Sequence, residues 1–544
     1  MNSYPPTNPS ATARPRLGPL ANTLIVAGGY LLSRVLGLAR DVIILNQFGT
    51  GREIDAYRAS FGILDLIYLV VAGGALGSAF IPVFSGFLAR KQEQDAWRLA
   101  NALLNLALVA LLAACALIAL LADPLVALTI GSGFDPEKRA LTAHILRLLL
   151  IQPALLGIGG LAKAALESFD RFTLPAIGAN LYNLGIIGGA LLAPWLGISA
   201  LIWGVIAGAT LFLLVQLPGL SAIGWRYMPG LRPDTPGLRQ VARLLGPRLF
   251  GQSAWQIGLV AIGSFASQLG EGAVTANAAA LQLMMLPHGL IALSLGTVIF
   301  PRLARLYGAG DMAALRETAL GAVRQVLFLA LPAAAIVGWL GVPIVRALFE
   351  RGRFTAASTA LTSQALSYYA LGLAAFAAAE ILVRTFYAMQ DTRTPVIVGI
   401  GAVGLNIALG WALLHLGAGL GGLALAFSIA NTLEASLLLA LLRRRLGPLG
   451  GAFWRAAGVM LLATLACGAA LLGLRLASAA YLPSITTSGA YHWPADFLPL
   501  LTWLAAAAGV GAAIYFGVTA LLGMEELRTA LVRLRRLAAL FVRK

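Results

Sequence analysis

The amino-acid sequence predicts an all-α polytopic membrane protein. Of its 544 residues, 59% are hydrophobic and only 11% are charged, whereas about 25% are charged in soluble proteins. The mean hydropathy is +0.85, and apolar runs long enough to span a bilayer recur along the chain. An internal sequence repeat further predicts how the helices are organised. We expect about 14 transmembrane helices, with two parallel six-helix repeats around a central cavity, plus two C-terminal helices.

Composition also excludes several classes of protein. The net charge of +17 does not indicate nucleic-acid binding, because the basic residues lie in short loops between apolar spans. Cys115 and Cys467 each lie within an apolar run, and the four histidines are isolated, so we expect no disulfide and no metal site. No phosphate-binding Gly-rich loop is present, and no soluble stretch is large enough for an enzyme. We therefore expect neither a cofactor nor enzymatic activity.

The spans follow one another with short connections. Residues 1–20 are basic and Pro-rich, and we expect them to form a disordered cytoplasmic tail rather than a signal peptide. The fourteen spans are expected at about 21–45, 57–88, 97–122, 141–166, 175–194, 198–222, 243–268, 275–301, 319–349, 360–387, 395–415, 419–442, 454–477 and 497–523. Residues 524–544 alternate apolar and basic positions at helical spacing, which predicts an amphipathic helix on the cytoplasmic leaflet. The alternative for this segment is a solvated run of charges.

Lys and Arg alternate between successive loops. Their excess on one side places both termini in the cytoplasm of a multi-pass plasma-membrane protein. The exception is the loop 350–358, which carries Glu350, Arg351 and Arg353 on the side predicted to be outside.

The sequence repeats itself at an offset of 219 or 220 residues. The matches are Pro82 with Pro301, Pro124 with Pro343, Ala140-Leu141-Thr142 with Ala360-Leu361-Thr362, and Pro175 with Pro395. This period covers six spans, so the two halves share one topology. The predicted parts are an N-terminal lobe at 21–222, a cytoplasmic linker at 223–242, a C-terminal lobe at 243–442 and two further helices at 443–523.

The first span contains three charged residues, Arg34, Arg40 and Asp41. Each is expected to cost about 2.5–3.5 kcal/mol in hydrocarbon, so such residues normally face a bundle interior or a wet cavity. At about 100° per residue, Arg34, Gly37 and Asp41 share one face, and a helix loosened at Gly37 would bring Arg40 inward. The alternative is that Arg40 and Asp41 extend to the membrane surface.

The second span begins with a polar stripe formed by Asp55, Arg58 and Asp65. These residues fall within about 80° of one another on a helical wheel. Asp55 and Arg58 have the spacing of an ion pair. Asp65 lies deeper, and we expect it to meet a cation from another helix, with Arg34 as the candidate.

Further charged residues mark later spans. Lys163 with Glu167, and Glu380 with Arg384, are pairs at the spacing of one helical turn in two repeat-related spans. They predict either an inner gate or interfacial ion pairs. Glu434 stands alone in the twelfth span, where it could carry a proton, bind a coupling cation or have no functional role.

Several motifs resemble the MurJ/MviN family of lipid II flippases, which is related to multidrug exporters of the MATE type. The motifs are Ser33-Arg34-Val35-Leu36-Gly37-Leu38-Ala39-Arg40-Asp41, Phe48-Gly49, Asp55-Ala56-Tyr57, Gly74-Ala75, Ala79-Phe80-Ile81-Pro82, Phe169-Asp170-Arg171-Phe172-Thr173-Leu174-Pro175 and Leu295-Gly296-Thr297. The resemblance implies fourteen helices in two lobes and export of lipid II, the lipid-linked peptidoglycan precursor, by alternating access. It also implies membrane lipids and cell-wall synthesis enzymes as partners.

The resemblance further implies roles for residues. Arg40 and Asp41 match the family's charged pair in helix 1, Arg34 its nearby arginine and Asp55 its acid at the start of helix 2. With Arg58 and Asp65, they form the expected substrate-binding set. The lipid diphosphate would be held by arginines, and helices 13 and 14 would form a groove for the polyprenyl tail.

The chain also departs from the family pattern. It reads Tyr68-Leu69 where many members have two arginines, Gly73 where they have an acid, and Leu281-Gln282 where they have Asp-Arg. The seventh span lacks the acid with which some members bind sodium. The missing cations are replaced by Arg58, Lys163 or Arg384, or the substrate differs. The alternatives are a MATE-like exporter of drugs or cations, a flippase for another polyprenyl-diphosphate glycan, and a scaffold for cell-wall enzymes.

Overall fold

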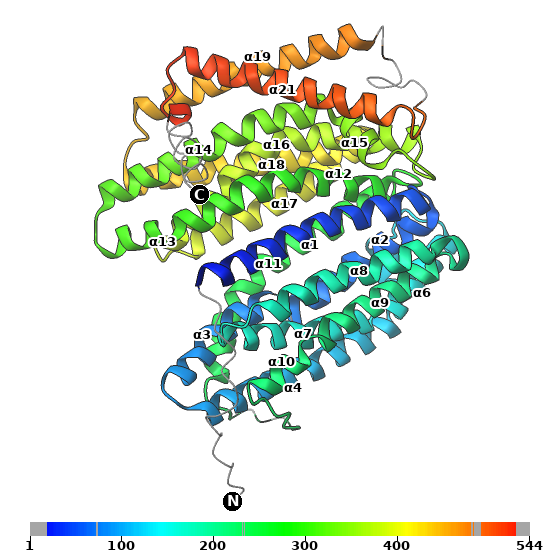
Figure 1. The fold of residues 1–544 in the computed structure, drawn as a ribbon, viewed down its shortest axis with the longest axis vertical. Helices are drawn as coiled ribbons and strands as arrows, with labels where there is room; N and C mark the ends of the chain where they lie inside the picture. Colours follow the sequence, from blue (N-terminus) through cyan, green and yellow to red (C-terminus); the bar gives the residue numbers. More distant parts are fainter. Residues whose placement is uncertain are drawn as a thin grey trace, which may run out of the picture. The chain divides into compact units, whose positions relative to one another are not determined.

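A computed structural model describes residues 19–71, 74–230, 232, 234–479, 482 and 491–528 (Figure 1). All of the regular structure in this part of the chain is helical. In chain order the helices are α1 (Pro19–Phe48), α2 (Arg52–Val71), α3 (Gly74–Ala89), α4 (Glu93–Leu120), α5 (Ala122–Leu128), α6 (Pro136–Leu149), α7 (Ile151–Ser168), α8 (Thr173–Leu196), α9 (Ile198–Leu214), α10 (Leu217–Ala222), α11 (Leu238–Ser267), α12 (Ala273–His288), the π-helix η1 (Gly289–Leu293), α13 (Ser294–Gly308), α14 (Met312–Trp339), α15 (Gly341–Phe349), α16 (Ala356–Ala388), α17 (Arg393–His415), α18 (Gly419–Leu446), α19 (Gly451–Ala479) and α21 (Phe497–Leu521). The predicted tail up to residue 18, and the predicted amphipathic helix beyond residue 528, lie outside the described residues.

Every predicted span coincides with a helix or with consecutive helices. Within the described residues, 11 stretches are long and apolar enough to cross a membrane. The three remaining predicted spans correspond to α1, to α2 with α3, and to α11. These helices contain polar or charged residues such as Arg40, Asp65 and Gln256. The all-α membrane fold is therefore confirmed, and the helices are consistent with fourteen spans.

The bounds of the helices reproduce the sequence repeat. α1 and α11 are offset by 219 residues at both ends, and so are α4 and α14. The stretch Pro136–Ser168 and α16 are offset by 220 at both ends. Even unusual backbone positions recur, because Asp170 and Gln390 have positive φ angles of 58° and 61° at corresponding turns. The repeat is thus a repeat of structure.

Several predicted spans are less regular than expected. Span 2 divides into α2 and α3, and residues 72 and 73 between them lie outside the described residues. The repeat-related span 8 contains the π-helical turn Gly289–Leu293, where the normal α-helical hydrogen-bond ladder is shifted. Span 9 ends earlier than predicted, since α14 stops at Trp339 and a separate helix, α15, begins at Gly341.

The chain divides into two compact units. The first contains residues 1–43, 71–115 and 151–246, and the second contains residues 44–70, 116–150 and 247–544. In the first unit, Phe80, Phe84 and Leu99 belong to a core between α3, α4 and α7. In the second unit, α16 packs against α12, α14 and α18, while α19 and α21 pack beside α14 (Figure 1). The predicted lobe boundaries remain a prediction.

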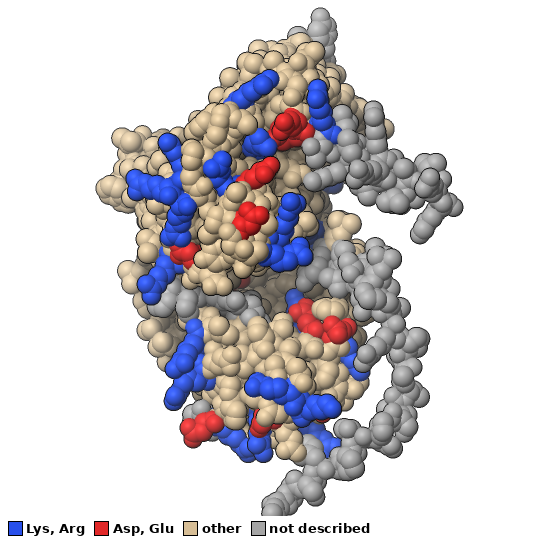
Figure 2. Space-filling model, turned by 90° about the vertical axis from the view of Figure 1, so that its left-hand side faces the viewer, with Lys and Arg blue, Asp and Glu red and all other residues tan. Residues whose placement is uncertain are grey.

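Basic side chains gather at helix ends that the sequence predicts to be cytoplasmic. In the second unit these exposed residues are Arg302, Arg305, Arg393, Arg443 and Arg444. Figure 2 shows a face on which Lys and Arg side chains outnumber those of Asp and Glu. This distribution follows the loop pattern from which the orientation is predicted.

The charged loop 350–358 has a structural explanation. The Glu350 carboxylate accepts hydrogen bonds from Arg346 Nε at 2.9 Å and from the Thr359 hydroxyl at 2.7 Å, and all three residues are buried. The Arg351 guanidinium lies over the Trp493 ring, 4.4 Å from its centroid, and desolvation lowers the pKa of Arg351. Glu350 and Arg351 are thus bound within the protein, whereas Arg353 is exposed.

Helices α8 and α9 pack through glycines one turn apart on each helix, Gly185 and Gly189 on α8 and Gly204 and Gly208 on α9. A Cβ atom on Gly204 would lie 2.8 Å from both Gly185 O and Gly189 Cα. A Cβ atom on Gly185 would overlap the backbone of Gly208. The backbones can approach this closely only because both helices present glycine at the contact.

We predict that Gly185→Ala destabilises the protein by about 1–3 kcal/mol, because the added methyl group must push α9 away. Gly188→Ala on the same helix is the matched control, since a Cβ atom there meets nothing within 4 Å. Thermal unfolding in detergent compares the two variants. Equal stabilities would contradict the proposed contact.

Candidate functional site

Arg40 and Asp41 form an ion pair inside the first unit. Arg40 Nη2 lies 3.2 Å from Asp41 Oδ2, and Arg40 Nε donates to Asp41 Oδ1 at 3.3 Å. Arg40 Nη1 also donates to Asn183 Oδ1 on α8 at 3.2 Å. The Arg40 side chain is 23% exposed and that of Asp41 2%. A bidentate contact with a carboxylate both neutralises and orients the guanidinium.

A second hydrogen bond joins Asn183 to α1. Its Nδ2 donates to Ser33 Oγ at 3.2 Å, so one amide binds two turns of α1. The helix runs without a break through Gly37, and the predicted loosening at that residue is wrong. The long Arg40 side chain reaches Asn183 unaided. The extension of Arg40 and Asp41 to the membrane surface is not observed, because both are held by protein groups.

Asp55 has four polar contacts within the second unit. Its carboxylate accepts hydrogen bonds from Lys138 Nζ at 2.8 Å, Gly272 N at 2.7 Å, Thr275 N at 2.9 Å and Thr275 Oγ1 at 2.6 Å. Asp55 is completely buried. The predicted ion pair with Arg58 is wrong, since the partner of Asp55 is Lys138 from α6.

Asp55 serves as the N-terminal cap of another helix. α12 begins after Gly272, which has no side chain with which to cap it. Asp55 binds the backbone N–H of Gly272 and of Thr275, which are among the unpaired donors of the first turn. A carboxylate there also interacts favourably with the positive end of the helix dipole. Asp55 therefore ties together α2, α6 and α12.

Asp135 and Arg52 hold the first turn of α6 in place. Asp135 caps it by accepting a hydrogen bond from Lys138 N at 3.0 Å. This backbone hydrogen bond lowers the pKa of Asp135 against the opposing effect of desolvation, with a smaller contribution from the charge of Arg52. Arg52 binds Asp135 and also lies 3.2 Å from Glu137 Oε2. This turn places the Lys138 side chain at Asp55.

The other members of the expected substrate-binding set lie on α1 and α2. Arg34 is exposed, Arg58 is half-buried and Asp65 is exposed. Asp65 lies ten residues beyond Asp55, about 15 Å along the helix axis. Arg34 and Asp65 belong to different units, and their pairing stays a prediction.

Both predicted pairs at one-turn spacing form. Lys163 Nζ lies 3.8 Å from Glu167 Oε1, and Arg384 Nε lies 2.6 Å from Glu380 Oε1. Arg384 also donates to Thr297 Oγ1 at 3.2 Å. Its side chain crosses α13 at Gly296, where a Cβ atom would lie 2.7 Å from Arg384 Nε. A side chain at this position would require the Arg384 side chain to shift, whereas glycine leaves room for it.

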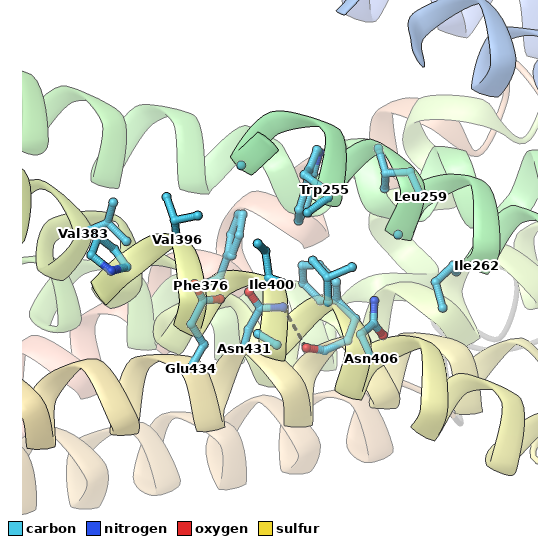
Figure 3. Close-up of a pocket in the computed structure, with 18 of the residues that line it drawn as sticks. Trp255, Leu259, Ile262, Phe376, Val383, Val396, Ile400, Asn406, Asn431 and Glu434 are labelled. Atoms are coloured by element: carbon cyan, nitrogen blue, oxygen red, sulfur yellow. Dashed lines mark hydrogen bonds between the residues drawn. The ribbon is translucent and has the colours of Figure 1, made fainter. Parts of the chain in front are cut away.

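Glu434 lines a cavity of about 240 Å³ within the second unit. The cavity lies between α11, α12, α16, α17 and α18, and Figure 3 shows Trp255, Phe376, Ile400 and Asn431 around it. Glu434 is half-buried, and no described residue forms an ion pair with it. It is thus set apart from Glu167 and Glu380, which each have a basic partner.

Sequence reasoning missed Asn183, Lys138 and Thr275. Asn183 is an amide inside a membrane-spanning helix, and such a residue signals an internal hydrogen bond. Lys138 follows a capping motif, Asp135-Pro136, which predicts a helix start but not its distant partner. Thr275 had no local signal.

Comparison with known proteins gives the family. The family described as lipid II flippase MurJ matches residues 44–490. The lipid II flippase MurJ of Burkholderia cenocepacia is 30% identical over 521 residues, which cover 92% of this chain and 97% of that protein. The chain belongs to the MurJ family. A probable lipid II flippase MurJ of Vibrio cholerae is 28% identical over 540 residues, covering 94% of this chain and 98% of that one.

Solved structures share the fold. A lipid II flippase MurJ in an inward closed conformation has a TM-score of 0.74 and 23% identity, and the match covers 91% of this chain and 99% of that one. An inward-facing multidrug resistance MATE family transporter has a TM-score of 0.66 and 15% identity, covering 78% and 98%. The resemblance stated from the motifs is confirmed, and this MurJ-family chain is a multi-pass membrane protein.

We predict that Asp55→Asn lowers the free energy of unfolding by about 3–5 kcal/mol, because it leaves Lys138 buried without a counter-charge. Thermal or denaturant unfolding of the purified protein measures the loss. Glu53→Gln is the control, since it removes an exposed carboxylate from the same first turn of α2.

A second substitution tests the cause. Adding Lys138→Met to Asp55→Asn removes the stranded charge, so the double variant should be more stable than Asp55→Asn alone. If the two losses simply add, the ion pair is not the source of the stability.

Proposed function

We propose that this chain moves lipid II from the cytoplasmic to the outer leaflet by alternating access. The family match over residues 44–490 and near full-length similarity to lipid II flippases support this proposal. The observation that carries it is the Arg40–Asp41–Asn183 network, an oriented arginine within a membrane-spanning helix at the position of the family's charged pair.

Arg40 would bind the diphosphate of the lipid. A guanidinium binds phosphate oxygens through paired N–H groups, and a group that is already oriented loses less entropy on binding. Asp41 neutralises Arg40 when the substrate is absent. It would also set the strength of binding, because the diphosphate must compete with the carboxylate for the same cation.

The other cationic side chains differ in how readily they could bind the lipid diphosphate. Lys163 and Arg384 each have a carboxylate of their own one turn away. Arg34 and Arg58, on α1 and α2, are further candidates to replace the arginines that the chain lacks at Tyr68-Leu69. Lys163 with Glu167, and Glu380 with Arg384, fit the role of gate contacts.

Asp55 would act as a latch rather than as a substrate contact. It belongs to the first sequence repeat, and its partners Gly272 and Thr275 belong to the second. Any motion that separates the repeats at this end must break these hydrogen bonds. Their rupture and reformation would accompany each cycle of alternating access.

The remaining assignments follow from topology and family. Both termini would lie in the cytoplasm, with residues 524–544 on the inner leaflet. The helices α19 and α21, which pack on each other and on α14, would guide the polyprenyl tail. Cell-wall synthesis enzymes would supply and consume the lipid.

We predict that this chain restores export in a bacterium depleted of its own lipid II flippase, and that Arg40→Ala reduces export by about tenfold or more. One charge-assisted hydrogen bond contributes about 1.5–3 kcal/mol, which corresponds to this factor. The measurement is the amount of precursor reaching the outer leaflet, at matched protein abundance. Arg98→Ala, at an exposed pair with Asp95, is the control.

Purified protein in liposomes separates the alternatives. Transport of lipid II, but not of a polyprenyl diphosphate carrying another glycan, is the expected result. Transport of the other glycan alone would identify a flippase of different specificity. Full activity of Arg40→Ala in both assays would contradict the role of Arg40. Absence of any transport by the parent protein in liposomes would favour a scaffold.

A further inference from the structure

The cavity lined by Glu434, within the second unit, has a negatively charged lining. A site for a diphosphate would need a positive charge instead. We infer that the cavity binds a small organic monocation, such as an alkylammonium ion with an aromatic or aliphatic substituent. The inference rests on the lining of this cavity and does not depend on the proposed transport of lipid II.

The polar part of the lining offers acceptors. The Glu434 carboxylate supplies a negative charge, and none of the described lining residues is Lys, Arg or His. Asn406 is 9% exposed, and its Oδ1 atom is buried without a hydrogen-bond partner. Asn431 Nδ2 donates to Phe427 O at 2.8 Å, which leaves the Asn431 Oδ1 atom as an acceptor (Figure 3). Such a lining favours a cation or a donor.

The apolar part of the lining is aromatic. Trp255 and Phe376 stack with centroids 5.8 Å apart, and Phe427 lies 6.1 Å from Trp255 and 5.6 Å from Phe376. Rings at these separations leave no room for a ligand between them, so they form one continuous wall. Aromatic surfaces attract cations and also remove apolar substituents from water.

The carboxylate and the aromatic wall together favour a small organic cation over other ligands. A diphosphate would meet Glu434 with no compensating cation, so the lipid headgroup is excluded from this cavity. An inorganic cation prefers a close shell of several oxygen ligands, whereas three aromatic rings form much of this lining. The volume of about 240 Å³ is somewhat below the usual range for ligand pockets, about 300–1,000 Å³, which indicates a small molecule.

The test is equilibrium binding of radiolabelled benzyltrimethylammonium to the purified full chain in lipid nanodiscs. We expect saturable binding that weakens about tenfold in Glu434→Gln and several-fold in Trp255→Leu. Glu317→Gln, an exposed carboxylate on α14, should bind like the parent. Neopentylbenzene has the same shape without the charge, and we expect it to compete at least about tenfold more weakly.

Each contrary outcome overturns the inference. Absence of saturable binding, unchanged affinity in Glu434→Gln, or equal competition by neopentylbenzene would exclude a cation site. Displacement by an equal concentration of sodium would assign the cavity to an inorganic ion. Thermal unfolding of Glu434→Gln, measured in parallel with the parent, shows whether the variant is folded. Because the binding assay contains no lipid II, its failure leaves the proposed transport untouched, and the reverse is also true.

Discussion

A charge in the hydrocarbon of a bilayer is unfavourable by several kcal/mol unless the protein itself provides a partner. This constraint organises much of the structure. Asp55 is buried against Lys138 and two backbone N–H groups, and Asp41 against Arg40. Glu350, in the loop that departs from the charge pattern, forms a buried pair with Arg346 of α15. The pair Asp55–Lys138 joins different helices, whereas Arg40–Asp41 and Arg346–Glu350 each lie on one helix or at its end.

The same constraint distinguishes structural from functional charges. Asp55 has its acceptor capacity filled by Lys138, Gly272 and Thr275, so it holds the ends of three helices. Glu434 instead faces a cavity whose described lining supplies no basic group. A carboxylate whose oxygens all accept hydrogen bonds from the protein stabilises one arrangement of the helices. A carboxylate left with its charge unmatched is available to a ligand.

Some parts of the fold and the site could be predicted because they depend on short-range order. Membrane-spanning length, loop charge and the offset of 219 or 220 residues are properties of the chain itself, and the helix bounds follow them. The pairs Lys163–Glu167 and Glu380–Arg384 were predictable for the same reason, since their spacing brings them together on one helix. Asp55 and Arg58 have a similar spacing, yet Lys138, 83 residues away, takes the place of Arg58.

The sequence alone determined that this chain is a repeated all-helical membrane protein, and its motifs indicated the family. Only the tertiary structure decided which partner each charge acquires. In the folded protein, Asp55 caps the start of α12 and Asn183 binds Arg40. The Arg384 side chain lies against α13 at Gly296. The tertiary structure also brought Glu434 together with aromatic residues from three helices. The reason is physical: helix formation depends on neighbours within about one turn, whereas burial and ion pairing depend on which helices pack together.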